Sequence, residues 1–351
     1  MYYLNFIKVF FISVIFFAIA SCNNKNAEIH YNEDIENIIR LAHDRKKSFC
    51  IVLFNDSSSI SSSYLEKLEE GTLTRLSDLI FNIINVALPE NKWYTQWLGV
   101  ENHVVTCVFS SSGILLATIT GASSYSFNCI NKSLEDDLSC NEFGYSPLFN
   151  IADNINKMDI LSKILNCKIE IDQGQDIGTE IDKTLDVVQY PYNLYLKCLN
   201  SQKHGKKEEA IYRAKQLLTF DDIPYLKIYS DLYDQVKHII DPTYDPDNGA
   251  ILSIDEKNIY FNHCIINQSK HFKIKLTNEG NSMLKIENID IGCSCVKLKD
   301  PSMTYFINPG DSMIISLEFT PDKIGELERE IFFVSNANNR LESIKIKALV
   351  E

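Results

Sequence analysis

The C-terminal part of the chain has the pattern of short strands. From residue 251 onward, apolar and polar residues alternate in short runs, as in FKIKLTN, where Phe272, Ile274 and Leu276 alternate with polar residues. Polar turn segments separate these runs, among them NEGNS, NPGDS, PDKIGE and NANN. Short alternating strands with such turns, and no helical pattern, predict an antiparallel β-sandwich over residues 251–351.

The first half of the chain mixes helical and strand patterns. Apolar residues fall on one helical stripe in residues 35–45, whereas residues 49–55 (FCIVLFN) form the continuous apolar run of a strand buried on both faces. Residues 64–89 predict a further helix, with a break near Gly71. Residues 103–121 predict two strands joined by a turn. Together these elements predict an α/β domain over residues 34–165.

The middle of the chain predicts helices between two linkers. Residues 166–190 are polar enough to predict a linker, and residues 191–240 predict two helices around Gly205 followed by a third. This segment resembles a single tetratricopeptide-like helical hairpin. Because one such repeat cannot bury its own apolar face, we expect it to dock on a neighbouring domain. Residues 241–250, rich in Pro, Asp and Gly, predict a second linker.

The N-terminus has the pattern of a signal peptide. The segment MYYLNFIKVFFISVIFFAIASC has one lysine, Lys8, and then an apolar run that is too short for a confident transmembrane helix. Its end, Ile19-Ala20-Ser21-Cys22, resembles the lipobox of bacterial lipoproteins. The resemblance implies a signal peptide over residues 1–21, lipidation of Cys22 with acyl chains such as palmitate, and a tether over residues 22–33. The alternative is an ordinary secretory signal followed by a chance cysteine.

The predicted anchor implies a location in the cell envelope. No aspartate follows Cys22, which favours the outer membrane, with the periplasmic or surface face left open. The formal net charge of the chain of 351 residues is -13. This charge argues against non-specific nucleic-acid binding and against an electrostatic attachment to anionic lipids, so the membrane is a partner through the lipid anchor alone.

The α/β domain resembles the thioredoxin-like family. The resemblance lies in FCIVLFND (49–56) and WLGVENHVVTCVFSSSGILLATITG (97–121). The Cys-x-x-Cys pair of that family would fall within Ser57–Ser63, with Ser59 and Ser62 as the best match, and the cis-proline would fall at about His103. A serine hydroxyl neither ionises readily nor forms a disulfide, so the resemblance implies a redox-inactive domain.

Two other readings of the serine run remain. One makes a serine the nucleophile of a hydrolase, but no Gly-x-Ser-x-Gly elbow or base accompanies it. In the other, the serines and Asp56 cap the helix that follows, which is the reading we favour.

The positions of the cysteines in the α/β domain predict structural roles for them. Cys50 and Cys107 lie within strand patterns and are expected to be buried and inert. Cys129 and Cys140 bracket a polar stretch, and this spacing permits a disulfide that closes a short loop.

The predicted sandwich has a signature made of Thr277, Asn278, Gly280, Cys293, Cys295, Pro309, Gly310, Gly325, Ser335 and Asn336. This signature resembles that of the immunoglobulin-like domains related to the hydin and abnormal-spindle domains. The bacterial branch of these domains has no known function and is typical of lipoproteins of Bacteroides-type bacteria. Ser294 stands where the Cys-Gly-Cys motif has glycine.

Three roles are open for Cys293 and Cys295. On a strand, residues two apart face the same side, so the two thiols could form a redox pair. They could also bind a soft metal such as Cu(I) or Zn(II), with Cys264, His263 or His271 as further ligands. In the third reading, which we favour, they are structural and packed at a bend of the sheet.

These observations predict a non-enzymatic cell-envelope lipoprotein that acts as a binding or scaffold module. We expect no cofactor and an envelope protein as partner, whose identity the sequence does not reveal. The alternative is an envelope thiol-redox protein that uses Cys293 and Cys295, or soft-metal binding at the same pair.

Overall fold

The computed structural model describes residues 27–55, 59–69, 76, 78–101, 104–135, 156–299, 301 and 304–351. These residues belong to two compact units. The first lies within Met1–Thr95, Asn102–Ser146 and Asp153–Ser162, and the second within Gln96–Glu101, Pro147–Ala152 and Lys163–Glu351. Among the helices of the described residues, none is long and apolar enough to cross a membrane.

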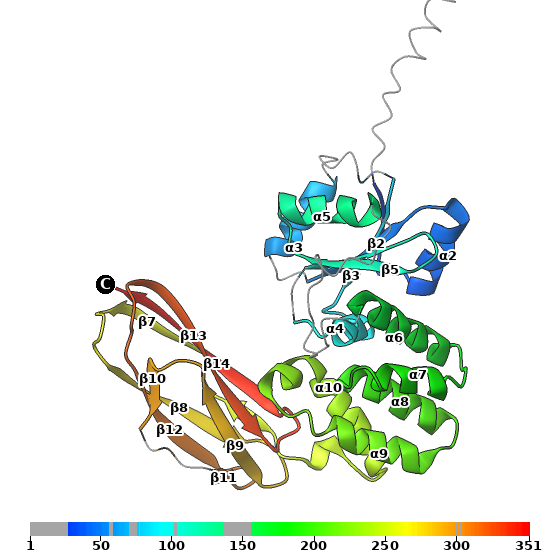
Figure 1. Ribbon diagram of the computed structural model, residues 1–351. Coiled ribbons are helices and arrows are strands. Elements are labelled where there is room, and N and C mark those ends of the chain that lie inside the picture. The colour runs from blue at the N-terminus through cyan, green and yellow to red at the C-terminus, as the bar shows by residue number, and fades with distance from the viewer. Residues whose placement is uncertain are drawn as a thin grey trace, which may run out of the picture. The chain divides into compact units, whose positions relative to one another are not determined.

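The first unit contains a five-stranded mixed sheet with the strand order β1-β3-β2-β4-β5 (Figure 1). Strands β1 and β2 run parallel to β3, whereas β4 runs antiparallel to both β2 and β5. The strands are β1 (Glu28–Tyr31), β2 (Phe49–Phe54), β3 (Ile80–Asn85), β4 (Val105–Phe109) and β5 (Leu115–Thr120). The helices of this part of the chain are α2 (Ile35–Arg45), α3 (Ser59–Glu69), the short η2 (Pro89–Asn91), α4 (Lys92–Leu98) and α5 (Ser124–Glu135).

The central strand β2 is buried on both faces, as its apolar run predicted. On one face Cys50 and Val52 pack with Tyr64 of α3 and Phe127 of α5. On the other face Phe49 stacks on the ring of the paired β4 residue, Phe109, with ring centroids 4.6 Å apart. The predicted helix over residues 35–45 and the predicted strand pair within residues 103–121 are also confirmed.

The predicted helix over residues 64–89 is wrong in its second half. Helix α3 ends at Glu69, and residues Ile80–Asn85 form strand β3, which pairs with β1 on one side and with β2 on the other. A short apolar run buried on both faces has no periodicity that separates a strand from a helix, so pairing with β2 decided its structure. Strand β1 was not predicted from the sequence, because it is short and largely half-buried.

Helices form the N-terminal part of the second unit. They are α6 (Lys157–Asp172, which begins in the first unit), α7 (Gly178–Leu185), α8 (Pro191–Lys203), α9 (Lys207–Leu217) and α10 (Ile223–Ile240), followed by the short η4 (Pro246–Asn248). Helices α8 and α9 form a hairpin around Gly205, whose φ of 71° lies in the left-handed region that favours glycine.

The interpretation of residues 166–190 as a linker is wrong. Residues up to Asp172 belong to α6, and α7 buries Ile181 and Leu185. Helix α7 was not recognised because it has only two turns and two strongly apolar buried positions. The polar segment between α6 and α7 added to the impression of a linker.

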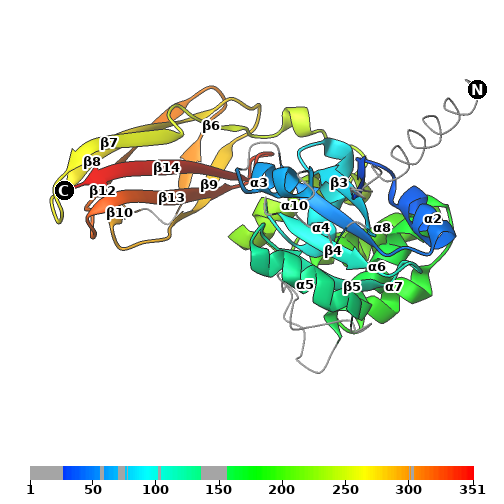
Figure 2. The same cartoon turned by 90° about the horizontal axis from the view of Figure 1, so that it is seen from above.

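The C-terminal part of the second unit is a β-sandwich, as predicted (Figures 1 and 2). One sheet has the order β10-β12-β8-β6 and the other β11-β9-β13-β14-β7. The strands are β6 (Leu252–Ile254), β7 (Asn258–Cys264), β8 (Lys270–Asn278), β9 (Leu284–Ile291), β10 (Val296–Leu298), β11 (Tyr305–Ile307), β12 (Ser312–Phe319), β13 (Gly325–Ser335) and β14 (Leu341–Val350). The pairing of β7 with β14 is parallel, which departs from the antiparallel pattern that we predicted.

One apolar core lies between the two sheets. Alternate residues of each strand contribute to it, including Ile274 and Leu276 of β8, Leu317 of β12 and Ile331 of β13. The alternation read from the sequence therefore assigned these side chains to the correct face.

Candidate functional site

Cys293 and Cys295 form a disulfide in the segment that joins the two sheets of the sandwich. This segment leads from β9 in one sheet to β10 in the other, and its residues 292–295 form bends and turns. The prediction that both cysteines lie on one strand is therefore wrong. Their position at a bend agrees with the interpretation that they are structural residues packed at a bend of the sheet. The turn, and not strand alternation, brings the two sulfur atoms together.

The two halves of the disulfide differ in exposure. Cys295 is 4% exposed and belongs to the core of the sandwich, whereas Cys293 is partly exposed and packs against the edge of that core. The Thr320 amide donates a hydrogen bond to the Cys295 carbonyl at 2.7 Å, which holds this half against strand β12. Solvent and other molecules therefore reach residue 293 more easily than residue 295.

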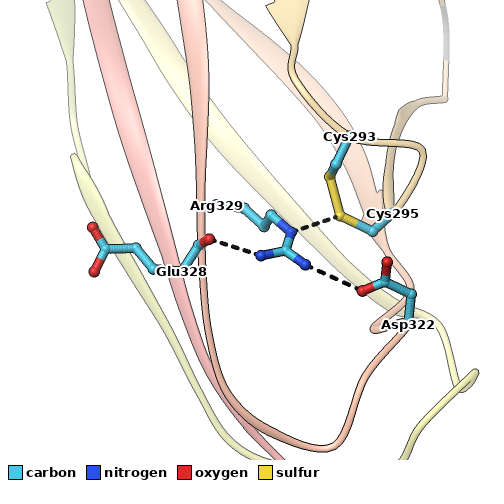
Figure 3. Close-up of a disulfide and its surroundings, with 5 residues drawn as sticks. All are labelled: Cys293, Cys295, Asp322, Glu328 and Arg329. Carbon is cyan, nitrogen blue, oxygen red and sulfur yellow. Dashed lines mark hydrogen bonds and ion pairs between the residues drawn. A yellow bond between two sulfur atoms is a disulfide. The ribbon is translucent and has the colours of Figure 1, made fainter. Parts of the chain in front are cut away.

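Arg329 of β13 lies against the buried half of the disulfide (Figure 3). Its Nε donates a hydrogen bond to Cys295 Sγ at 3.3 Å. The other nitrogens bind the Glu328 carbonyl at 3.0 Å and Asp322 Oδ1 at 3.2 Å, so three acceptors fix the plane of the guanidinium. The site thus places a permanent positive charge beside one sulfur of the pair.

Arg329 was missed at the sequence level, although the sequence contains a signal for it. Leu327, Ile331 and Phe333 alternate along β13 and contact the core, and Arg329 occupies the same parity. An arginine at a core-facing position needs a partner, because an unpaired buried charge is costly. Its ionic partner Asp322 is near in sequence, but the Cys295 sulfur that its Nε contacts lies 34 residues away along the chain, which no local pattern reveals.

The side chains considered as further metal ligands lie in other interactions. Cys264 is a free thiol buried in the sandwich core, His263 contacts Glu351 at 3.1 Å, and His271 contacts Glu318 at 3.5 Å. Within the described ranges, no group of three or more His, Cys, Asp or Glu residues could hold a metal ion. The two sulfurs of Cys293 and Cys295 are joined to each other and present no thiolate ligand in this state.

The serine run begins helix α3. Ser59 is its first residue and Ser62 is exposed, while His103, Asp56 and Cys22 lie outside the described residues. Ser61 is buried and its hydroxyl accepts a hydrogen bond from the Asn55 amide at 3.2 Å, which ties the end of β2 to α3. This serine has a structural role that the prediction of capping did not specify.

The cysteines of the first unit are buried thiols. Burial raises the pKa of both Cys50 and Cys107, and the neighbouring Cys107 adds to the effect on Cys50, so both are inert as predicted. Cys129 is also a free thiol, and Cys140 lies outside the described residues. Residues 124–135 fold into α5 and direct the Cys129 side chain into the core, and the Cys129–Cys140 disulfide stays a prediction.

Several residues of the C-terminal signature serve the fold itself. Asn278 is fully buried; its Nδ2 donates to the carbonyls of Ser282 at 2.8 Å and Ile307 at 3.0 Å, and its Oδ1 accepts from the Gly280 amide at 3.1 Å. Asn336 bridges the Lys285 amide and the Met283 carbonyl. With these roles assigned, the disulfide and Arg329 remain as the chemically distinctive group of the sandwich.

Fold and site together define a two-unit protein with a C-terminal β-sandwich that carries a disulfide. Residues 252–350 match the model of a family described as "Protein of unknown function (DUF1573)". The match covers the sandwich and less than half of the chain. No curated protein sequence is significantly similar to this chain.

Solved structures match parts of this chain at low sequence identity and with low TM-scores. A protein of unknown function from Porphyromonas gingivalis W83 is 14% identical, with 31% of this chain and 50% of that chain covered and a TM-score of 0.27, so the similarity spans about half of that protein. The ASH/PapD-like domain of human CEP192 is 11% identical, with 31% and 89% covered and a TM-score of 0.26. Thioredoxin f from spinach chloroplast is 16% identical, with 31% and 95% covered and a TM-score of 0.26.

Proposed function

We propose that this protein is a lipid-anchored protein of the cell envelope that binds an envelope protein partner through its β-sandwich. The first unit acts as a redox-inactive domain of thioredoxin-like type, in which α3 carries serines in place of a reactive cysteine pair. The anchor is the acylated Cys22, and the outer membrane is the favoured location because no aspartate follows it.

The observation that carries this proposal is the outer edge of the second sheet. Strand β7 is the last strand of its sheet in the described residues and pairs with β14 alone. Tyr260 of β7 is 61% exposed and Leu349 of β14 is 45% exposed, both on the outer face of the sheet. An edge strand with an exposed aromatic residue can accept an extended segment of another protein by adding a strand.

A site-specific crosslinking experiment tests the proposed surface. A photoreactive residue replaces Tyr260 in the full chain, and in a control it replaces Tyr212 of α9, which has a similar exposure of 57%. We expect one defined crosslinked protein at position 260 in intact cells, lost when Leu349→Lys is added, and no such product at position 212. The same product at both positions, or none at position 260, would contradict the proposal.

The anchor has a separate test. Cys22→Ser should prevent incorporation of labelled fatty acid and move the protein out of the membrane fraction, whereas Ser21→Ala should leave both unchanged. Separation of inner and outer membranes by density then assigns the membrane. A Cys22→Ser protein that still sediments with membranes would show that another part of the chain attaches it.

A second candidate function is thiol–disulfide exchange at Cys293 and Cys295. The observation that favours it is the disulfide itself, in which Cys293 is partly exposed while the Cys295 sulfur lies beside a fixed guanidinium. Titration of thiols in the folded chain before and after mild reduction tests it, with the Cys293→Ser/Cys295→Ser double variant as control. Two additional thiols should appear in the wild-type chain and none in the variant.

A further inference from the structure

We propose that the Cys293–Cys295 disulfide accepts electrons from a dithiol in a fixed direction: the incoming thiolate attacks Cys293, and Cys295 leaves as a thiolate stabilised by Arg329. This inference rests on the second candidate function and adds the order of the two sulfurs, the role of Arg329 and the class of substrate.

Access selects the sulfur that is attacked. Thiol–disulfide exchange requires the attacking thiolate to approach one sulfur directly, so the accessible sulfur reacts. Cys293 is partly exposed, whereas Cys295 is 4% exposed and its carbonyl is hydrogen-bonded to the Thr320 amide. The geometry therefore favours attack at Cys293.

Charge selects the sulfur that leaves. Arg329 Nε already donates to Cys295 Sγ at 3.3 Å in the disulfide, where sulfur is a weak acceptor. When the S–S bond breaks, this contact becomes a charge-assisted hydrogen bond to a thiolate without any movement of the arginine. A leaving group that is stabilised as a thiolate departs faster. Access and charge thus assign opposite roles to the two sulfurs.

Asp322 acts as a positioning residue for Arg329. Its Oδ1 accepts from the guanidinium at 3.2 Å, on the same side of the guanidinium as Cys295, whereas the Glu328 carbonyl lies on the other side (Figure 3). The Glu328 carboxylate points away from the disulfide and lies 3.7 Å from Lys345 and 3.6 Å from Lys347, so Glu328 contributes only its carbonyl to the site. Arg329 is thus the cation that contacts the disulfide in Figure 3.

The exchange balances as a transfer of two electrons. One thiolate of the substrate dithiol bonds to Cys293 Sγ, the S–S bond breaks, and its electron pair passes to Cys295 Sγ. The second substrate thiolate then attacks the substrate sulfur of this mixed disulfide and releases Cys293. The dithiol is oxidised to a disulfide, Cys293 and Cys295 are reduced, and the two protons lost by the dithiol are taken up by the two protein sulfurs through solvent.

The test measures a single turnover with dithiothreitol as the probe. Reduction of the oxidised full chain is followed in the wild type, in Arg329→Met, in Arg329→Lys and in Lys297→Met, which removes an exposed cation on neighbouring β10. Loss of the cation should slow reduction roughly tenfold in Arg329→Met. This factor corresponds to a loss of thiolate stabilisation at Cys295 of about one pKa unit. Arg329→Lys should recover part of the rate and Lys297→Met should match the wild type.

Two further measurements separate this role of Arg329 from a structural one. In Cys295→Ser, Cys293 should form a stable mixed disulfide with a thiol-reactive probe, whereas Cys295 in Cys293→Ser should react slowly. The ultraviolet absorbance of the thiolate should appear at a lower pH in the reduced wild type than in reduced Arg329→Met. Thermal unfolding identifies any variant that is misfolded.

Each outcome has a defined meaning. A disulfide that dithiothreitol does not reduce in the folded chain would overturn both this inference and the second candidate function. Reduction at equal rates in the wild type and Arg329→Met, or trapping at Cys295, would overturn the inference and leave that function standing. The binding function proposed for the β7 edge is unaffected by either result.

Discussion

The backbone of Gly280 lies so close to that of Gly249 that a Cβ atom on Gly280 would be 2.3 Å from the Gly249 carbonyl oxygen. The two segments are joined by hydrogen bonds, from the Glu279 amide to the Ile251 carbonyl and from the Asn281 amide to the Gly249 carbonyl, both at 2.9 Å. Gly280, a residue of the C-terminal signature, is thus explained by a close contact between two backbone segments, where no side chain fits.

Gly280→Ala should therefore destabilise the sandwich by about 2 kcal/mol, the typical cost of overpacking a close contact. The matched control is Gly292→Ala, because a Cβ at Gly292 would have no heavy atom within 4 Å. Unfolding by denaturant measures both variants. Equal stability of the two would show that the contact at Gly280 relaxes without cost.

Two buried tyrosines should respond differently to loss of their hydroxyl groups. The Tyr190 hydroxyl donates to the Trp97 carbonyl at 2.8 Å, whereas the buried Tyr229 hydroxyl has no hydrogen-bond partner among the described residues. Tyr190→Phe should cost about 1 kcal/mol or more because it removes this buried hydrogen bond. Tyr229→Phe should be neutral or stabilising because it removes an unsatisfied group. Thermal unfolding of both variants checks this, and a larger loss in Tyr229→Phe would contradict it.

Lys197 joins three helices by its ammonium group. The side chain is 3% exposed, and Nζ lies 2.7 Å from Asp182, 3.1 Å from Glu209 and 3.0 Å from the Gly178 carbonyl. Lys197→Met should destabilise the helical part by about 2 kcal/mol, because it leaves two partly buried carboxylates with less compensating charge.

The control for Lys197 is Lys206→Met, which breaks an exposed pair with Asp176 and should cost between about 0 and 1 kcal/mol. Denaturant unfolding at low and high salt compares the two variants. A larger loss for Lys206→Met than for Lys197→Met would show that burial does not determine the strength of these pairs.

Glu209 should make stability depend on pH in the acid range. Burial raises the pKa of this carboxyl group, but hydrogen bonds from Ser201 and Lys197, together with the charges of Lys197 and Arg213, lower it by more, so the net pKa lies below the usual 4.5. A group whose pKa is depressed in the folded state contributes stability above its unfolded pKa, and this contribution is lost as the pH falls through the folded pKa.

The free energy of unfolding should therefore fall as the pH drops below 4.5, and Glu209→Gln should reduce this dependence. Asp176, whose pKa is also lowered, by hydrogen bonds from Asn200 and Lys206, maintains part of the dependence in the variant. Glu208→Gln, at an exposed neighbouring position, should behave as the wild type. An unchanged acid dependence in Glu209→Gln would exclude this role.

The Cys293–Cys295 disulfide should contribute little to stability. It joins residues separated by 2 positions, and the chain-entropy gain of a disulfide grows with the loop that it closes, so the loss on reduction should be about 1–2 kcal/mol. The reduced chain should remain folded, as judged by circular dichroism and by protection of the buried Cys264 from alkylation. Unfolding of the sandwich on reduction would instead identify the bridge as a structural requirement.

Much of the fold could be predicted because its patterns are local. Alternation along β8 assigned Ile274 and Leu276 to the core, and the apolar run of β2 predicted a strand buried on both faces. The failures occurred where local patterns are ambiguous. The apolar run of β3 fits both a strand and a helix, and α7 shows too few apolar residues to be recognised.

The candidate site was predicted only in part. The spacing of Cys293 and Cys295 identified the pair as a candidate site. The expected reason for their closeness, alternation along a strand, was wrong, because a turn brings them together. Arg329 lies on another strand, and its contact with Cys295 follows from the packing of β13 against the turn. Spacing along the chain contains no information about such a contact.

The sequence by itself determined the sandwich, the helical hairpin around Gly205 and the serines of α3, because these features depend on periodicity and on residue chemistry. Only the tertiary structure decided which atoms surround each residue. It placed a guanidinium beside one of two neighbouring sulfurs, a backbone carbonyl against Gly280 and a thiol at Cys129 in the core. The physical reason is that periodicity acts over a few residues, whereas burial and charge depend on segments that folding brings together from distant parts of the chain.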